Sequence, residues 1–276
     1  MQRAKIPKVI IIGAGLGGLA LYHALIKNKD IKEFDVKIFE RDSSPRERWQ
    51  GYHIALNFYG IRSLLNCVPS SITSNLQRAM PNPLPDVEFH GFSLFDNTGR
   101  LLITFPAKQF KDFNELVKVP DKFSMNITYR DRLRDVLLES VPVHWDKICI
   151  RYEETKDGVW VMFDDGSQEY CDILVGADGI NSPVRKQRLP ELQIFDFGLT
   201  HMVSNIAVPK HLMDRFIKLQ GNSLLQKSLG LHGDSSTLLF RLIPIEQEPV
   251  YENKGNYNEP HYRVTLNYSY PTKLDD

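Results

Sequence analysis

A glycine-rich segment near the amino terminus is the part of this sequence whose spacing most clearly predicts chemistry. Residues 13–18, GAGLGG, fit the pattern G-x-G-x-x-G through Gly13, Gly15 and Gly18. Between a strand and a helix, the first glycine permits a tight turn, the second lets main-chain amides approach a pyrophosphate, and the third allows close helix packing. The free N–H groups and the dipole of the helix start then attract phosphates. The segment therefore predicts binding of a dinucleotide.

An acidic residue follows at the position where a nucleotide ribose would need it. Glu40 comes about twenty residues after Gly18, at the end of the next expected strand. A carboxylate there can accept hydrogen bonds from both hydroxyls of an adenosine ribose, and it would repel a 2′-phosphate. The alternative is a glycine-rich turn that holds no ligand. The spacing by itself does not distinguish FAD from NAD.

The elements that must position these residues are predicted as a β-α-β unit. Residues 8–12, KVIII, form a β-branched run typical of a strand buried on both faces. A helix is expected over 19–26 and a second strand over 34–40. A signal peptide or membrane helix is the competing interpretation, because residues 9–26 carry no charged side chain. The glycines in the middle of that stretch favour a strand, a turn and a helix, so no membrane segment is expected.

The rest of the chain alternates between strand-like and helical patterns. The further expected elements are a short helix over 59–66, a hairpin over 86–105, a helix over 130–139, meander strands over 148–154 and 159–163 with a third that ends at 173–175, and irregular strands after Gly198 that include 238–243 and 263–270. The fold class is therefore α/β, or α+β overall. A Rossmann-like βαβ lobe with a three-stranded β-meander is interleaved with a mixed β-sheet lobe. The expected lobes are 1–81 with 106–190, and 82–105 with 191–276.

The composition is that of an ordinary globular protein, with 42% apolar and 25% charged residues. Basic and acidic residues number 34 each, so no overall field draws the chain to nucleic acid or to anionic lipid. The three cysteines form no CxxC pair, which fits a reducing, cytoplasmic location. The eight histidines are scattered and give no ligand spacing for a metal. We expect neither a nucleic-acid partner nor a metal site.

Three later segments carry a resemblance to a known family. They are Glu40-Arg41 with residues 48–54, RWQGYHI; residues 130–134, RDRLR; and residues 176–185, GADGINSPVR. With the glycine turn, they resemble the class A FAD-dependent monooxygenases. These are single-component aromatic hydroxylases with the p-hydroxybenzoate hydroxylase fold, and the similarity is strongest to their fungal members. The resemblance therefore favours FAD over NAD, and it makes the first lobe FAD-binding and the second a substrate lobe.

The resemblance also implies roles for single residues. Glu40 would hold the adenosine ribose with Arg41 beside it, and Arg130 would bind the phosphate–ribityl region. The Asp178-Gly179 pair would contact the pyrophosphate region and help to receive a nicotinamide nucleotide, braced by Arg185. The candidate cofactor-binding residues are Gly13, Ala14, Gly15, Gly18, Glu40, Arg41, Gly51, His53, Arg130, Asp178 and Gly179. No catalytic acid or base is assigned.

Each of these roles has a structural alternative. Arg130 could pair with a surface acid such as Asp131, Asp178-Gly179 could be an ordinary turn, and His53 could be purely structural.

The function that the resemblance implies is hydroxylation. NADPH or NADH would reduce FAD, the reduced flavin would capture O₂, and a flavin hydroperoxide would transfer one oxygen to a small aromatic or other electron-rich substrate. Two alternatives stay open: a flavin- or NAD-dependent reductase without oxygen insertion, and a truncated, non-catalytic FAD-binding fragment. No motif marks the substrate, the choice between NADPH and NADH, or the oligomeric state.

The carboxyl-terminal part departs from the family pattern. The resemblance is good from about Lys8 to Pro190 and only general afterwards. Family members continue with a G-D-x-x-H segment, which closes on the ribityl chain and the flavin ring. Here the sequence ends at Asp276, and Gly233-Asp234 is followed by SST. We therefore expect a chain truncated before that segment, with one side of the flavin site missing.

Overall fold

The computed structural model describes residues 5–27, 31–48, 52–80, 92–105, 113–118, 125–220, 225–229, 237–245 and 261–272. Contacts divide the chain into two compact units, and each is described by itself. The first unit is Met1–Ala79 with Thr128–Ile194, and the second is Met80–Ile127 with Phe195–Asp276. Sequence reasoning assigned 106–127 to the first lobe, whereas the contacts group this stretch with the second unit. The two lobes as functional domains stay a prediction.

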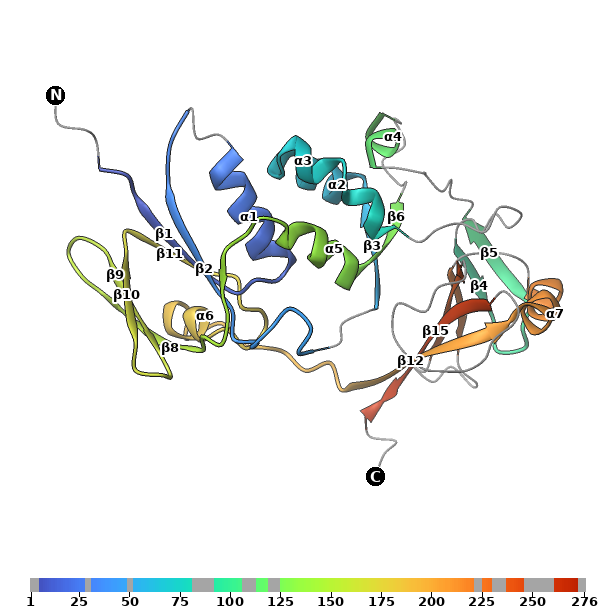
Figure 1. The fold of residues 1–276 in the computed structure, drawn as a ribbon. Helices are drawn as coiled ribbons and strands as arrows, with labels where there is room; N and C mark the ends of the chain where they lie inside the picture. Colours follow the sequence, from blue (N-terminus) through green and yellow to red (C-terminus); the bar gives the residue numbers. More distant parts are fainter. Residues whose placement is uncertain are drawn as a thin grey trace. The chain divides into compact units, whose positions relative to one another are not determined.

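The first unit combines a parallel sheet, helices and an antiparallel meander (Figure 1). Its strands are β1 (Lys8–Ile12), β2 (Asp35–Phe39), β3 (His53–Asn57), β7 (Val143–His144), β8 (Cys149–Glu154), β9 (Val159–Phe163), β10 (Gln168–Cys171) and β11 (Ile173–Gly176), with β6 (Met125–Tyr129) at the division between the units. Its helices are α1 (Leu16–Lys27), α2 (Phe58–Cys67), α3 (Ser70–Thr73), the 3-10 helix η1 (Leu76–Ala79), α5 (Arg130–Leu138) and α6 (Pro183–Arg188). The predicted α/β class with a Rossmann-like unit is confirmed.

The parallel sheet has the order β11-β1-β2-β7. Its central strand β1 has both neighbours parallel to it, and Val9 to Ile12 are almost completely buried. That burial on both faces is the reason for the unbroken apolar run at residues 8–12. The strand predicted there is confirmed at the same bounds, while α1 begins three residues earlier than expected.

The meander packs against one face of this sheet. Phe39 of β2 lies with its ring centroid 4.8 Å from that of Phe163 on β9. The buried cluster that joins the two layers consists of Ile10, Ile12, Phe39, Cys149, Val161, Phe163 and Cys171. Helices α1, α2 and α5 lie together on the opposite side of the sheet (Figure 1). The sheet is therefore held from both faces, which fixes the loops at its ends.

The third meander strand differs from the prediction. Sequence reasoning gave one strand that ends at 173–175, but the chain breaks at Asp172 into β10, antiparallel to β9, and β11, parallel to β1. The Asp172 carboxylate accepts a hydrogen bond from the Lys8 main-chain N–H at 2.7 Å and pairs with Lys5 at 2.5 Å. This break transfers the chain from the meander to the parallel sheet. As a result, the segment after β11 reaches the same sheet edge as the glycine turn.

The second unit is built on one mixed, six-stranded sheet in the order β12-β15-β14-β13-β4-β5, with β13 and β4 parallel and the other pairs antiparallel. Its elements are β4 (Phe92–Phe95), β5 (Leu101–Phe105), α4 (Phe113–Lys118), β12 (Leu199–Pro209), α7 (Lys210–Gln220), β13 (Leu225–Leu229), β14 (Thr237–Ile245) and β15 (His261–Pro271). The predicted mixed sheet and the β4–β5 hairpin are confirmed. Residues 86–91 of the expected hairpin lie outside the described ranges.

Helix α7 was not predicted, because the region after Gly198 was expected to hold strands only. Its apolar residues Leu212, Met213, Phe216 and Ile217 follow a spacing of i, i+1, i+4 and i+5, which is typical of one helix face. Met213 is buried, as this pattern predicts. None of the helices in the described ranges has the length and apolarity needed to span a membrane.

A buried histidine in α1 makes the stability of the fold depend on pH. His23 Nε2 donates a hydrogen bond to the Leu137 carbonyl oxygen at 2.8 Å, and Nδ1 is buried without a hydrogen-bond partner among the described residues. Burial lowers the pKa of His23, opposed by the bond to Leu137. The folded chain therefore holds a neutral imidazole at a pH where the unfolded chain already binds a proton.

We expect the free energy of unfolding to fall as the pH falls below the unfolded pKa of about 6.5. Above that pH the His23 contribution is fully present, because neither state binds the proton. His23→Gln keeps a donor for Leu137 and cannot titrate. Urea unfolding at pH 7.5 and pH 5.5 should show a loss in the wild type that exceeds the loss in the variant by on the order of 1 kcal/mol. Equal losses would contradict this assignment.

Candidate functional site

Three loops meet at one edge of the parallel sheet because three strands end level there. Ile12 of β1 is paired with Phe39 of β2 and with Gly176 of β11. The Gly13 N–H donates to the Phe39 carbonyl at 2.7 Å, and the Ala177 N–H donates to the Ile12 carbonyl at 2.7 Å. The strand order reverses at β1, since β2 lies on one side and β11 on the other. Ligands of open α/β sheets bind at the carboxyl edge at such a switch point.

Glycine is required at different positions of the turn for different structural reasons. Gly13 has a φ of +106°, and a Cβ there would lie 2.5 Å from the Ala177 carbonyl oxygen. A Cβ at Gly18 would lie 1.9 Å from the Gly13 carbonyl oxygen. At Gly15, by contrast, no described atom other than those of Gly15 and its two chain neighbours lies within 4 Å of an added Cβ. The fold therefore requires Gly13 and Gly18, whereas Gly15 leaves open space.

Glu40 points back at the glycine turn. Its Oε2 accepts a hydrogen bond from the Ala14 N–H at 2.8 Å, and its Oε1 accepts one from the Asp42 N–H at 3.2 Å. The residue is almost completely buried, with 6% of its surface exposed. The two features that the sequence predicts to act together, the turn and the acid, are thus directly joined.

Arg134 is a buried part of this site that sequence reasoning missed. Its Nε donates to the Ala14 carbonyl at 2.9 Å, and its Nη1 donates to the Pro45 carbonyl at 3.2 Å. Its Nη2 lies 3.6 Å from Glu40 Oε2. Burial lowers the pKa of Arg134, opposed by Glu40 and then by Asp42. The spacing i, i+4 from Arg130 to Arg134 was the available signal, since it places both on one side of a helix.

A second ion pair orders the loop after β2. Arg48 Nε lies 2.7 Å from Asp42 Oδ1, and Arg48 Nη2 donates to Asp42 Oδ2 at 2.9 Å. The hydrogen bond to Asp42 raises the pKa of Arg48. Such a two-point contact fixes the guanidinium plane as well as the charge. The loop that carries Glu40 and Arg41 is therefore held in a defined conformation.

A cavity of about 420 Å³ lies between these loops, within the range of small-molecule sites. Seven of the predicted residues line it: Gly13, Gly15, Glu40, Arg41, Arg130, Asp178 and Gly179. Five basic side chains and two acidic ones face it: Arg41, Arg48, Arg130, Arg134 and Lys147, and Glu40 and Asp178. Ala14, Gly18 and His53 do not line it, and Gly51 lies outside the described residues. The excess of basic groups suits an anionic ligand.

Asp178 faces the cavity with unused acceptors. Both of its carboxylate oxygens are buried without a hydrogen-bond partner among the described residues. Buried polar atoms are almost always hydrogen-bonded in folded proteins, so these oxygens indicate donors that a ligand would supply. Neighbouring Gly179 has a φ of +86°. Arg185, expected to brace this pair, instead donates its main-chain N–H to Ser182 Oγ at 2.9 Å. No hydrogen bond or ion pair among the described residues joins Arg185 to Asp178.

Arg130 and Cys149 also line the cavity. The Arg130 guanidinium lies 5.6 Å from the centroid of the Tyr52 ring, and its main-chain N–H donates to the Tyr52 carbonyl at 3.1 Å. Burial, with a smaller effect of Asp178, raises the pKa of the Cys149 thiol to about 11. A thiol with that pKa stays protonated at neutral pH and is no nucleophile.

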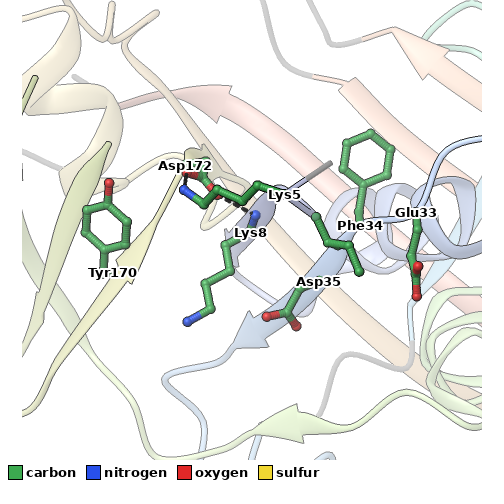
Figure 2. Close-up of a pocket in the computed structure, with 8 residues that line it drawn as sticks. Lys5, Lys8, Glu33, Phe34, Asp35, Tyr170 and Asp172 are labelled. Atoms are coloured by element: carbon green, nitrogen blue, oxygen red, sulfur yellow. Dashed lines mark hydrogen bonds and ion pairs between the residues drawn. The ribbon is translucent and has the colours of Figure 1, made fainter. Parts of the chain in front are cut away.

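A different hollow of about 510 Å³ lies at the opposite, amino-terminal edge of the sheet. Figure 2 shows the Lys5 side chain directed at Asp172, with Tyr170 and Glu33 at opposite ends of the hollow. None of the predicted site residues lines it. Because ligands of parallel sheets bind at the carboxyl ends of the strands, the cavity at the glycine turn is the candidate site.

Several proteins of known identity are similar to this chain in sequence. An FAD-dependent monooxygenase, thnD, of Trichoderma harzianum is 33% identical over 193 residues, which is 66% of this chain and 40% of that protein. The 6-methylsalicylate 1-monooxygenase atA of Aspergillus terreus is 30% identical over 191 residues, with the same two shares. The 6-hydroxynicotinate 3-monooxygenase of Pseudomonas fluorescens is 26% identical over 201 residues, which is 71% of this chain and 46% of that protein.

These three relatives are monooxygenases, and several relatives of this chain, thnD among them, are named as FAD-dependent. The chain spans less than half the length of these three monooxygenases. No protein-family model matches it.

Solved structures show the same fold. A protein of Photorhabdus luminescens described as an FAD-containing monooxygenase superposes with a TM-score of 0.72 at 24% identity, over 97% of this chain and 64% of that one. HpxO of Klebsiella pneumoniae, solved with FAD and uric acid, gives a TM-score of 0.64 at 20% identity, over 96% and 56%. The chain therefore has the fold of FAD-containing monooxygenases.

Proposed function

We propose that the first unit binds the ADP half of FAD in the cavity at the carboxyl edge of the parallel sheet. The observation that carries this proposal is the direct hydrogen bond between the glycine turn and the Glu40 carboxylate, both of which line one cavity. The FAD-dependent relatives and the neighbour solved with FAD support the choice of cofactor.

The residues present fit this group. The open space at Gly15 and the amino terminus of α1 would receive the diphosphate, with Arg130 and Arg41 as cations. Glu40 would accept hydrogen bonds from the ribose hydroxyls. The unpartnered oxygens of Asp178 would accept from hydroxyl groups of the cofactor, because an acceptor-only carboxylate requires a donor opposite it. Ala14 and Gly18 would act through the shape of the turn. The resemblance implies that Gly51 and the backbone at His53 line the loop against the cofactor, and we keep this as part of the proposal.

We also propose that this chain is part of a monooxygenase that inserts one oxygen of O₂ into a small aromatic or other electron-rich substrate, with NADPH or NADH as reductant. Bound FAD would supply the redox and oxygen chemistry, while the protein binds and orients it. The relatives named for 6-methylsalicylate and 6-hydroxynicotinate, and the neighbour with uric acid, support a planar ring as substrate.

The activity is tested by following NADPH oxidation and oxygen uptake together in FAD-loaded protein. We expect aromatic acids to stimulate both, with hydroxylated product. NADPH oxidation with an added acceptor but without oxygen insertion would favour a reductase instead. FAD binding without any NAD(P)H oxidation would identify a non-catalytic cofactor-binding chain, and would overturn the monooxygenase proposal for this chain alone.

Glu40→Gln is expected to weaken FAD binding about 10- to 100-fold, because hydrogen bonds to a charged acceptor contribute about 1.5–3 kcal/mol. Glutamine keeps the shape of the side chain but removes its charge and one acceptor. The FAD dissociation constant is measured by quenching of flavin fluorescence. Glu47→Gln, at an exposed acid of the same loop that does not line the cavity, serves as the control. An unchanged constant in Glu40→Gln would count against our placement of the ribose.

A further inference from the structure

The contacts of Arg134 connect every part of the candidate site that would meet the adenosine. One guanidinium joins the carbonyl of Ala14 in the glycine turn, the carbonyl of Pro45 in the loop after β2, and the region of Glu40. The side chain is 7% exposed, so its position is set by these contacts and not by solvent. Arg134 comes from α5, far from both segments in the sequence. Together with the direct bond between Glu40 and Ala14, it therefore helps to fix their separation.

Two acids and two bases, Arg134 included, form a network of close charge pairs. Glu40 and Asp42 are the two acids, and Arg134 and Arg48 are the two bases. Arg48 pairs with Asp42 at hydrogen-bond distance, whereas Arg134 Nη2 lies 3.6 Å from Glu40 and 3.9 Å from Asp42. Without Arg134, the buried Glu40 carboxylate would lose the guanidinium that lies 3.6 Å from it, which is costly and would favour its displacement.

The hydrogen bonds of Glu40 leave room for a ligand. A carboxylate has about four acceptor positions, two on each oxygen. The Ala14 N–H uses one position on Oε2, and the Asp42 N–H uses one on Oε1. Arg134 Nη2, at 3.6 Å, is too far to use another as a hydrogen bond. One position on each oxygen therefore stays available, which matches two hydroxyls on adjacent carbons.

We propose that Arg134 is a positioning residue of the cofactor site, which holds Glu40 and the glycine turn so that one carboxylate accepts both ribose hydroxyls. This inference rests on the proposed binding of the ADP half of FAD. Arg134 itself contacts no part of the ribose in this account. Its charge lines the cavity and would attract the diphosphate of any ADP-like ligand equally, so the positioning role is read from the part of the affinity that depends on the ribose hydroxyls.

The test compares ADP with 2′,3′-dideoxy-ADP, which lacks both hydroxyls, by calorimetry on the full chain. In the wild type we expect the dideoxy compound to bind about 10- to 100-fold more weakly. In Arg134→Met that ratio should approach one, because Glu40 no longer presents both acceptors. Arg132→Met is the matched control, since Arg132 lies on the same helix but does not line the cavity, and it should keep the wild-type ratio.

A wild-type ratio in folded Arg134→Met would overturn the inference, because a purely structural role would lower both affinities equally. If that variant does not fold or binds no measurable ADP, the same ratio of ADP to dideoxy-ADP affinity is measured in Arg134→Lys. Lysine keeps the charge but cannot reach Ala14, Pro45 and Glu40 together, so a reduced ratio supports the inference and an unchanged one overturns it. Failure of both variants to fold would also overturn it. No binding of ADP or FAD to the wild type would overturn the proposed function instead.

Discussion

Gly15→Val should abolish FAD binding while the protein stays folded. Apart from Gly15 and its two chain neighbours, no described residue has an atom within 4 Å of an added Cβ at this position, so the fold has room for a side chain. The same space is where a diphosphate would approach the main-chain amides of the turn. A branched side chain there would keep the phosphates away. We expect the FAD dissociation constant to rise by roughly 100-fold or more, equivalent to about 2.7 kcal/mol.

Gly17→Val is the matched control for this prediction. Apart from its chain neighbours and the backbone of its own helix, Gly17 likewise has no described atom within 4 Å of an added Cβ, but it does not line the cavity. The two variants should unfold at similar temperatures, and only Gly15→Val should lose FAD. Full cofactor content in Gly15→Val would contradict our placement of the diphosphate. A parallel loss of FAD binding in both variants would show that the effect is not specific to Gly15.

Gly18→Ala should destabilise the fold itself. The added methyl would lie 1.9 Å from the Gly13 carbonyl oxygen, a main-chain atom held in the turn, so α1 would have to move away from β1. Overpacking of this kind costs roughly 1–3 kcal/mol and occasionally more, and we expect the upper end because the contact is to backbone.

Gly17→Ala offers the comparison for this effect, since it adds the same methyl to the same helix at an exposed position. Alanine is preferred over glycine within helices by up to about 1 kcal/mol, so this variant should be as stable as the wild type or more so. The measurement is urea unfolding followed by circular dichroism. Equal midpoints for Gly18→Ala and Gly17→Ala would show that the turn is looser than described.

The elements that sequence reasoning located correctly are those with strong local patterns. Strand β1 is a short run of β-branched residues between polar and glycine segments, and α5 has a regular apolar face. The division of β10 from β11 was missed because it depends on pairing with β1, which lies more than 150 residues earlier in the chain. Helix α7 has a helical spacing of apolar residues in Leu212, Met213, Phe216 and Ile217, but this short pattern lies between segments that favour strands.

The residues of the candidate site likewise fall into two groups: those that the local spacing predicts, and those that only the fold brings to the site. The glycines and Glu40 follow a spacing set by one β-α-β unit, so sequence alone could place them together. Arg134 could not be found from that spacing, because its partners Ala14 and Pro45 lie on other segments and offer only main-chain carbonyls. The segment at 176–185 marks Asp178 as a cofactor contact, but only the structure shows that both of its carboxylate oxygens are buried without a hydrogen-bond partner among the described residues. Motifs identify the residues that face a ligand, while the residues that support them depend on the fold.

The most direct test of the central claim is a titration of the purified chain with FAD, with ADP as competitor and FMN as comparison. FMN carries the flavin but lacks the adenosine half. We predict saturable binding of FAD, displacement by ADP, and markedly weaker binding of FMN. FMN binding as tight as FAD, or FAD binding that ADP does not displace, would contradict an adenosine site at the glycine turn and Glu40.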